Sequence, residues 1–199
     1  MRTPPVERNP SHATHGREYT ALRPTGTADT ASARKDPVND ELHHYRPEGL
    51  PETDVYLSRT FAAPVERVFA YFTEPDLLAT WFGPETFTTP RDTVEIDARE
   101  GGVWKLAMQD PETRELLPID GVITAFEAPT HLVVRLDAQT GGGAELSDVQ
   151  LDIRFEERDG HGRLTLHETP FDLEGRHQTE QGWRLSFDKL DAELAIPAE

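Results

Sequence analysis

GWRLSFDKLDAEL, residues 182–194, is the most regular apolar pattern in the chain. Its large apolar residues recur at spacings of 4, 3 and 4: Trp183, Phe187, Leu190 and Leu194. Residues at these spacings share one face of an α-helix. The pattern therefore predicts a long amphipathic helix over about residues 176–195, which Pro197 ends.

The residues before this helix alternate between apolar and polar, as β-strands with one buried face do. The alternation predicts two paired strands, residues 148–157 and 162–169, around a turn at Asp159-Gly160. Other segments with strand patterns are residues 55–61, 93–99, 103–109, 116–127 and 131–137. Because consecutive strands are joined by short turns, we expect an antiparallel sheet.

Two short helices are predicted after the first strand. Residues 64–72 carry apolar residues at i, i+3, i+4 and i+7, and a second helix around Leu78 and Trp81 ends at Gly83-Pro84. The predicted fold class is therefore α+β. A curved antiparallel sheet wraps around the long C-terminal helix, and the two short helices plug one end. Such an arrangement favours an internal cavity between the sheet and the helix.

Residues 1–53 differ from the remainder of the chain. Seven prolines fall within residues 1–52, among many polar residues and almost no aliphatic ones. Such a segment cannot bury enough apolar surface to offset the entropy lost on ordering. We therefore expect a disordered N-terminal extension over residues 1–53 and one folded domain over residues 54–199. The histidine pairs of the extension are interpreted as solvated tail residues: His12, His15, His43 and His44.

The charge is strongly negative and unevenly distributed. The chain carries a formal net charge of −17, with a net of −1 in residues 1–53 and −16 in residues 54–199. A field of this sign repels nucleic acid and anionic lipid, so neither is an expected partner. The chain has no cysteine, no apolar run of membrane-spanning length and no apolar core of a secretory signal near its start. We expect a cytoplasmic protein.

No cofactor or metal site is expected from the motifs. The glycine run at Gly141–Gly143 lacks the Lys-Ser/Thr and the helix of a phosphate loop. His131, His161 and His167 lie on separate strands or turns, without zinc spacing.

An ordered series of motifs carries a family resemblance. Residues 54–196 resemble the SRPBCC superfamily, also called START-like or helix-grip domains, in the branch of the homologues of the activator of the heat-shock-protein-90 ATPase. The matching residues are Ala63-Pro64-Val65, Glu74-Pro75, Leu78, Trp81-Phe82-Gly83-Pro84, Asp97, Arg99, Gly101-Gly102, Trp104, Met108, Asp110, Gly121, Phe126, Pro129, Leu132, Gly182-Trp183, Leu190 and Leu194. The chain departs from the family at Thr179, where a histidine is common, so any role of that imidazole is in doubt here.

The resemblance implies a cavity that holds an apolar or amphipathic small molecule. The predicted ligand-binding residues are Tyr71, Trp81, Trp104, Met108, Phe126, Gly182, Trp183 and Phe187. The three tryptophans fit an aromatic core as well as a ligand-stacking surface whose indole N–H fixes one polar group. Gly182 fits either a frayed helix or a missing side chain that widens the cavity beside Trp183.

No catalytic residue is assigned. Glu168 shares a strand face with Leu164 and Leu166, so it is considered as a general base, but a position in water at the strand end is preferred. His167 points to the opposite face from Glu168. Asp97 and Arg99 are interpreted as a structural brace.

Three functions remain open. The first is non-catalytic binding of a hydrophobic or amphipathic small molecule. The second is a protein-interaction module associated with a chaperone, which rests on the resemblance and the negative charge. The third is a cyclase or lyase acting on a polyketide-like or aromatic substrate, for which Glu168, Asp97, Tyr71 and His167 are the ionisable groups on offer.

Overall fold

The computed structural model describes residues 46–84, 86–139, 145–169 and 171–197. These residues all belong to one of the two units into which the chain divides, Lys35–Glu199. Residues 1–45 of the predicted disordered extension lie outside the described residues, and so does the glycine run at 141–143. Residues 46–53 form turns, in which Arg46 donates a hydrogen bond to the backbone oxygen of Asp54 at 3.0 Å. The domain boundary at Asp54 stays a prediction.

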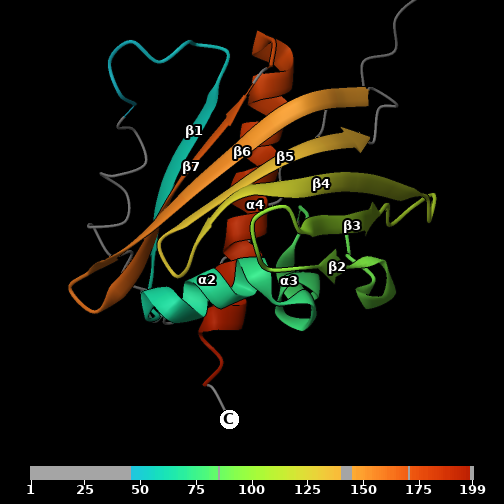
Figure 1. Cartoon of the computed structure of the whole chain (residues 1–199). Helices are drawn as coiled ribbons and strands as arrows, with labels where there is room; N and C mark the ends of the chain where they lie inside the picture. Colours follow the sequence, from blue (N-terminus) through green and yellow to red (C-terminus); the bar gives the residue numbers. More distant parts are fainter. Residues whose placement is uncertain (1–45, 85, 140–144, 170, 198–199) are drawn as a thin grey trace, which may run out of the picture. The chain divides into compact units, whose positions relative to one another are not determined.

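Seven strands of the described residues form one antiparallel sheet, in the order β1-β7-β6-β5-β4-β3-β2. The strands are β1 (Val55–Phe61), β2 (Glu95–Ile96), β3 (Val103–Gln109), β4 (Leu116–Glu127), β5 (His131–Gln139), β6 (Glu145–Arg158) and β7 (His161–Thr169). The helices are α2 (Val65–Thr73), α3 (Pro75–Trp81), the 3₁₀ turn η2 (Arg91–Thr93) and α4 (Leu173–Leu194). Figure 1 shows α4 crossing one face of the sheet. The predicted α+β fold is confirmed.

The largest difference from the predicted elements lies in residues 93–99. A single strand was expected there, but the chain forms η2 followed by only two strand residues. Pairing with β3 ends at Ile96, because the next residues enter a tight turn that closes with a hydrogen bond from Gly102 N to Arg99 O at 2.9 Å. A Cβ on Gly102 would lie 1.9 Å from the backbone oxygen of Asp97, so this turn requires glycine.

The C-terminal helix begins earlier than the apolar stripe predicts. The side chain of Asp172 accepts a hydrogen bond from Gly175 N at 2.7 Å and so caps a helix that begins at Leu173 rather than at residue 176. The one apolar residue of the added turn, Leu173, is exposed and does not extend the buried stripe, so the apolar period does not reveal this turn. Among the described residues, no helix combines the length and apolar character that crossing a membrane requires.

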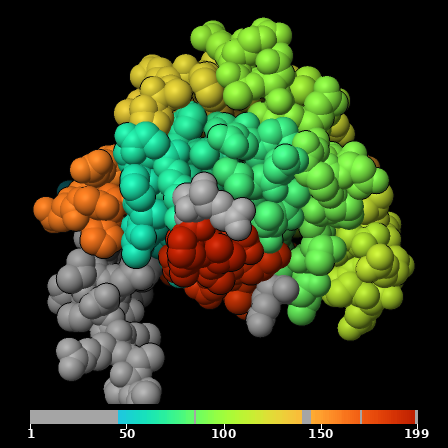
Figure 2. Space-filling view, turned by 90° about the horizontal axis from the view of Figure 1, so that it is seen from below, coloured from blue at the N-terminus to red at the C-terminus, as the bar shows by residue number. Residues whose placement is uncertain are grey.

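Buried aromatic rings cluster where α2 and α3 meet the sheet. Figure 2 views the C-terminal end of α4 with α2 and α3 beside it. Phe72 is fully buried and packs on Trp81 and Phe155, with ring centroids 4.8 and 5.3 Å apart. Two indoles satisfy carbonyls at the end of α2 that have no partner within the helix: Trp81 Nε1 donates to Tyr71 O at 2.9 Å and Trp104 Nε1 to Phe72 O at 3.0 Å.

Candidate functional site

A cavity of about 810 Å³ lies between the sheet and the N-terminal half of α4. Strands β3 to β7 contribute residues to its wall from one end of the sheet, and the loop after α3 supplies its rim. Most of the lining side chains are apolar, including Phe82, Phe87, Leu117, Ile119, Leu136 and Leu151. α4 contributes Trp183 together with the small residues Gly182 and Ser186. The space between sheet and helix that the sequence predicts is therefore present.

Four of the eight predicted ligand-binding residues line this cavity. They are Trp104, Met108, Gly182 and Trp183. Phe82 lies between the two indoles, with its ring centroid 5.7 Å from that of Trp104 and 5.5 Å from that of Trp183, both in edge-to-face geometry. These three rings form an aromatic wall that separates the cavity from the core. Whether any of these residues binds a ligand stays a prediction.

The other four predicted residues do not reach the cavity. They lie at the α2 end of the domain: Tyr71, Trp81, Phe126 and Phe187. Phe126 packs on Phe69 with ring centroids 5.6 Å apart, and Phe187 meets Phe61 edge to face at 6.0 Å. Helices α2 and α3 fill this space, so these four side chains pack in or against the hydrophobic core.

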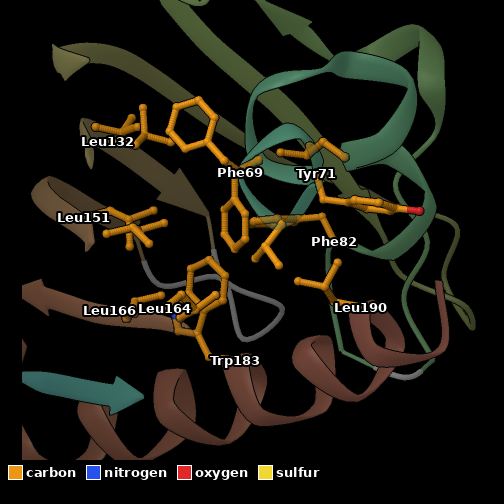
Figure 3. Packing of buried hydrophobic residues seen from close by; sticks show 14 of the residues in the cluster. Phe69, Tyr71, Phe82, Leu132, Leu151, Leu164, Leu166, Trp183 and Leu190 are labelled. Atoms are coloured by element: carbon orange, nitrogen blue, oxygen red, sulfur yellow. The ribbon is translucent and has the colours of Figure 1, made fainter. Parts of the chain in front are cut away.

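All three indole N–H groups already have hydrogen-bond acceptors within the protein. Trp81 and Trp104 donate to backbone carbonyls at the end of α2. Trp183 Nε1 donates to Glu168 Oε2 at 2.6 Å. Figure 3 shows Trp183 extending from α4 toward the sheet residues Leu164 and Leu166. The polar group that faces the cavity beside Trp183 is thus the carboxyl of Glu168.

Glu168 is buried, so the preferred expectation that it lies in water at a strand end is wrong. Its exposed fraction is 6%. It is paired between Val55 of β1 and Leu151 of β6, and α4 covers its face of the sheet through Trp183. Burial raises the pKa of Glu168 from its ordinary value of 4.5 to about 7, although the hydrogen bond from Trp183 opposes this shift.

The structure also places the other ionisable residues that the sequence singled out. His167 does point to the other face of the strand, where its Nε2 lies 2.8 Å from Asp54 Oδ2. Asp97 and Arg99 form an ion pair at 2.7 Å, but both side chains are about half exposed or more, so the pair belongs to the surface of a turn. Thr179 lines the cavity at the position where the resembled family often has histidine.

Sequence reasoning missed a contact that holds the cavity rim. Lys189 Nζ, on α4, donates hydrogen bonds to Gly83 O at 3.2 Å and Phe87 O at 3.0 Å. Both carbonyls belong to the loop that also places Phe82 and Pro84 at the cavity. Partial burial lowers the pKa of the Lys189 ammonium.

The described residues contain no group of three or more histidine, aspartate or glutamate side chains placed to hold a metal ion. The chemistry that the cavity offers is therefore an apolar volume with one buried carboxyl, whose protonation changes near neutral pH.

Several solved structures share this architecture. A protein from Silicibacter pomeroyi, described as AHSA1, has 28% sequence identity and a TM-score of 0.63, over 71% of this chain and 97% of that one. Protein CV1439 from Chromobacterium violaceum has 21% identity and a TM-score of 0.64, over 74% and 100%. Protein Ms6760 from Mycobacterium smegmatis has 23% identity and a TM-score of 0.60, over 74% and 94%. The last two show the fold alone.

No curated protein matches the chain. The family resemblance inferred from the sequence is confirmed by the first structure and by a family model that covers α2 to α4. Because that model, Activator of Hsp90 ATPase homolog 1-like protein, matches residues 62–195, the chain belongs to this family.

Proposed function

We propose that the domain binds a hydrophobic or amphipathic small molecule in the cavity between the sheet and α4, without catalysing a reaction. The observation that carries the proposal is the cavity itself, about 810 Å³ with a mostly apolar lining. Pockets that bury a small organic ligand typically range from ~300 to ~1,000 Å³ and are lined in this way. A cytoplasmic location is part of the same proposal.

Two features of α4 support this function. Gly182 lies at the cavity, and a Cβ added there would meet only Pro84, at 3.8 Å, so the absent side chain leaves room for a ligand. Lys189 ties the rim loop to the helix, which keeps Phe82 and Phe87 in place around the opening. A ligand would therefore meet a wall that is already formed, which lowers the entropy cost of binding.

Filling the cavity tests the proposal. The full chain is titrated with the neutral apolar dye Nile red, whose fluorescence rises in an apolar site. We expect saturable binding that Gly182→Leu weakens at least about tenfold, because the new side chain occupies cavity volume. Replacing a helical glycine raises helix propensity by about 1 kcal/mol, so the variant stays folded.

Gln181→Leu is the matched control, since it adds the same side chain one position earlier, where the residue is exposed. Its dye binding should equal that of the wild type. Equal binding by Gly182→Leu and the wild type, or no saturable binding at all, would contradict the proposal.

One observation favours a second candidate, a cyclase or lyase. A buried carboxyl with a pKa of about 7 that lines an apolar cavity has the properties of a general base. Such a base would remove an acidic α-proton from a polyketide-like or aromatic substrate. Incubation with poly-β-ketone substrates, followed by mass spectrometry, tests this candidate. Turnover that survives Glu168→Gln would exclude Glu168 as the base.

A further inference from the structure

The charged side chains at the cavity are all of one sign. Glu168, Asp172 and Glu174 are acidic, and the described residues that line the cavity include no lysine, arginine or histidine. The remaining polar lining residues are neutral: Gln139, Gln178, Thr179 and Ser186. A ligand with a negatively charged headgroup would therefore find no cationic side chain to pair with among these lining residues.

The N-terminus of α4 does not supply the missing positive charge. Helix N-termini attract anions through their unpaired N–H groups and the helix dipole. Here the Asp172 side chain already accepts from Gly175 N at 2.7 Å, and Glu174 adds a second negative charge to the first turn. This end of the helix is therefore neutralised by the protein's own carboxylates.

Glu168 has acceptor capacity left for a ligand. Its Oε2 accepts the indole N–H of Trp183, and this is its one hydrogen bond among the described residues. The strand residues on either side of it are Val55 and Leu151, both apolar and fully or almost fully buried. A carboxylate in such surroundings is stabilised strongly by a donor or a cation, because water cannot solvate it fully.

We propose that the ligand of this cavity is an amphipathic amine, whose apolar body fills the space beside Trp104 and Trp183 and whose protonated amino group binds the Glu168 carboxylate. The inference rests on the proposed function above and adds the chemical class of the ligand. Asp172 and Glu174 add attraction for the cation near the opening, and the net charge of −16 in residues 54–199 acts in the same direction.

The proposal predicts a pH dependence with a definite sign. The pKa of Glu168 is about 7 because of burial, so an ammonium ion must displace a proton from part of the molecules at neutral pH and from most of them at pH 6. Affinity for the amine should fall as the pH decreases through 7. The residues that contact or pair with Glu168 are Trp183 from α4, Val55 from β1 and Leu151 from β6, none of which carries a titratable side chain in this range. The other charged residues that line the cavity are Asp172 and Glu174.

Three ligands of equal chain length separate the alternatives: dodecylamine, dodecanol and dodecanoate. Calorimetric titration of the full chain at pH 8 should give an affinity for the amine at least about tenfold higher than for dodecanoate, since a hydrogen bond to a charged group has about this effect. Glu168→Gln should lower the affinity for dodecylamine about tenfold and change the affinity for dodecanol less than threefold. The amide oxygen of glutamine can still accept the indole hydrogen bond of Trp183.

Glu66→Gln is the matched control, because it removes the same charge from an exposed position on α2, outside the cavity lining. It should weaken amine binding less than threefold. Amine binding that survives Gly182→Leu would indicate adsorption to the acidic surface and would overturn the inference.

The outcomes for the two proposals differ. If none of the three ligands binds, the proposed binding function and the inference both fail. If dodecanol binds and the amine binds no better, or if Glu168→Gln leaves amine binding unchanged, the binding function stands and the amine inference is overturned. Tightest binding of dodecanoate would also overturn it.

Discussion

The two ends of the sheet use similar side chains for different purposes. At the end covered by α2, Phe126 of β4, Leu132 of β5 and Phe155 of β6 pack against Phe69 and Phe72. At the other end the same strands present residues such as Ile119, Leu136 and Leu151, which line the cavity. The strands are apolar at both ends, although register shifts interrupt the pairing between Ile123 and Ala125 of β4 and between Leu136 and Ala138 of β5.

The difference between the two ends comes from the helices above them. Helix α2 fills its end with Val65, Val68, Phe69 and Phe72, whereas the N-terminal half of α4 brings only Trp183 with small and polar residues to the other. The alternation of apolar residues in a strand therefore predicts that one face of the sheet is covered. The size of the side chains on the opposing helix decides whether the space between sheet and helix is filled.

The largest expected effect concerns the filled end. Phe72→Ala should reduce the free energy of unfolding by about 3–5 kcal/mol, because it leaves a void among fully buried rings. Urea denaturation of the two proteins measures the difference. A loss below about 1 kcal/mol would mean that this end is as loosely filled as the cavity end.

The second effect is the pH dependence of stability at the cavity end. Folding raises the pKa of Glu168 from 4.5 to about 7, so this group stabilises the fold below pH 4.5, and the contribution is lost as the pH rises through 7. Glu168→Gln removes the titration. The variant should match the wild type near pH 4 and exceed it at pH 8 by up to about 3 kcal/mol.

Denaturation curves at both pH values check this prediction. Parallel curves for Glu168→Gln and the wild type would contradict the burial of Glu168.

A third prediction concerns the indole that holds this carboxyl. Trp183→Phe keeps most of the aromatic wall and removes the hydrogen bond that lowers the pKa of Glu168. The pKa of Glu168 should therefore rise above its wild-type value, and stability at pH 8 should fall by about 1–3 kcal/mol. NMR titration of the glutamate side chains follows the pKa, and an unchanged or lower value would contradict the contact.

The fourth effect is smaller and concerns the rim. Lys189→Met removes the hydrogen bonds to Gly83 O and Phe87 O, so amide hydrogen exchange in residues 86–89 should become faster and stability should fall by about 1 kcal/mol. Lys105→Met is the control, because Lys105 forms an exposed ion pair with Asp120 and should change stability by less than about 0.5 kcal/mol. Unchanged amide hydrogen exchange in Lys189→Met would show that the loop after α3 keeps its conformation without these hydrogen bonds.

The smallest effect completes the comparison. Met108→Ala, at the cavity, enlarges a space that already exists rather than opening a new one, so the loss of stability should stay near 1 kcal/mol. The same denaturation experiment compares it with Phe72→Ala. Equal losses would mean that the two ends of the sheet are packed alike.

Local patterns predicted the elements well where one period held over many residues. Strands β3 and β4 have the predicted bounds, and the stripe of α4 lies on the core as expected, with Trp183, Phe187, Leu190 and Leu194 all buried. The prediction was poorest at residues 93–99, where a turn fixed by contacts of Gly102 interrupts an alternating pattern.

The candidate site was predicted only in part, for a physical reason. All eight predicted ligand-binding residues face the interior or its boundary, but periodicity cannot distinguish an interior that is filled from one that is hollow. Trp81 and Trp183 look equivalent in the sequence, yet Trp81 lies under α2 and Trp183 at the cavity. The missed contact of Lys189 joins residues about a hundred positions apart, which no local pattern records.

The sequence by itself determined the antiparallel sheet, the two short helices and the apolar face of α4, because hydrophobic periods of 2 and 3.6 are properties of neighbouring residues. Only the tertiary structure decided that Glu168 is buried and titrates near pH 7, and that the space beside it remains open. Its surroundings come from β1, β6 and α4 together. The environment of a side chain is set by elements distant in the chain, whereas the shape of each element is set largely within it.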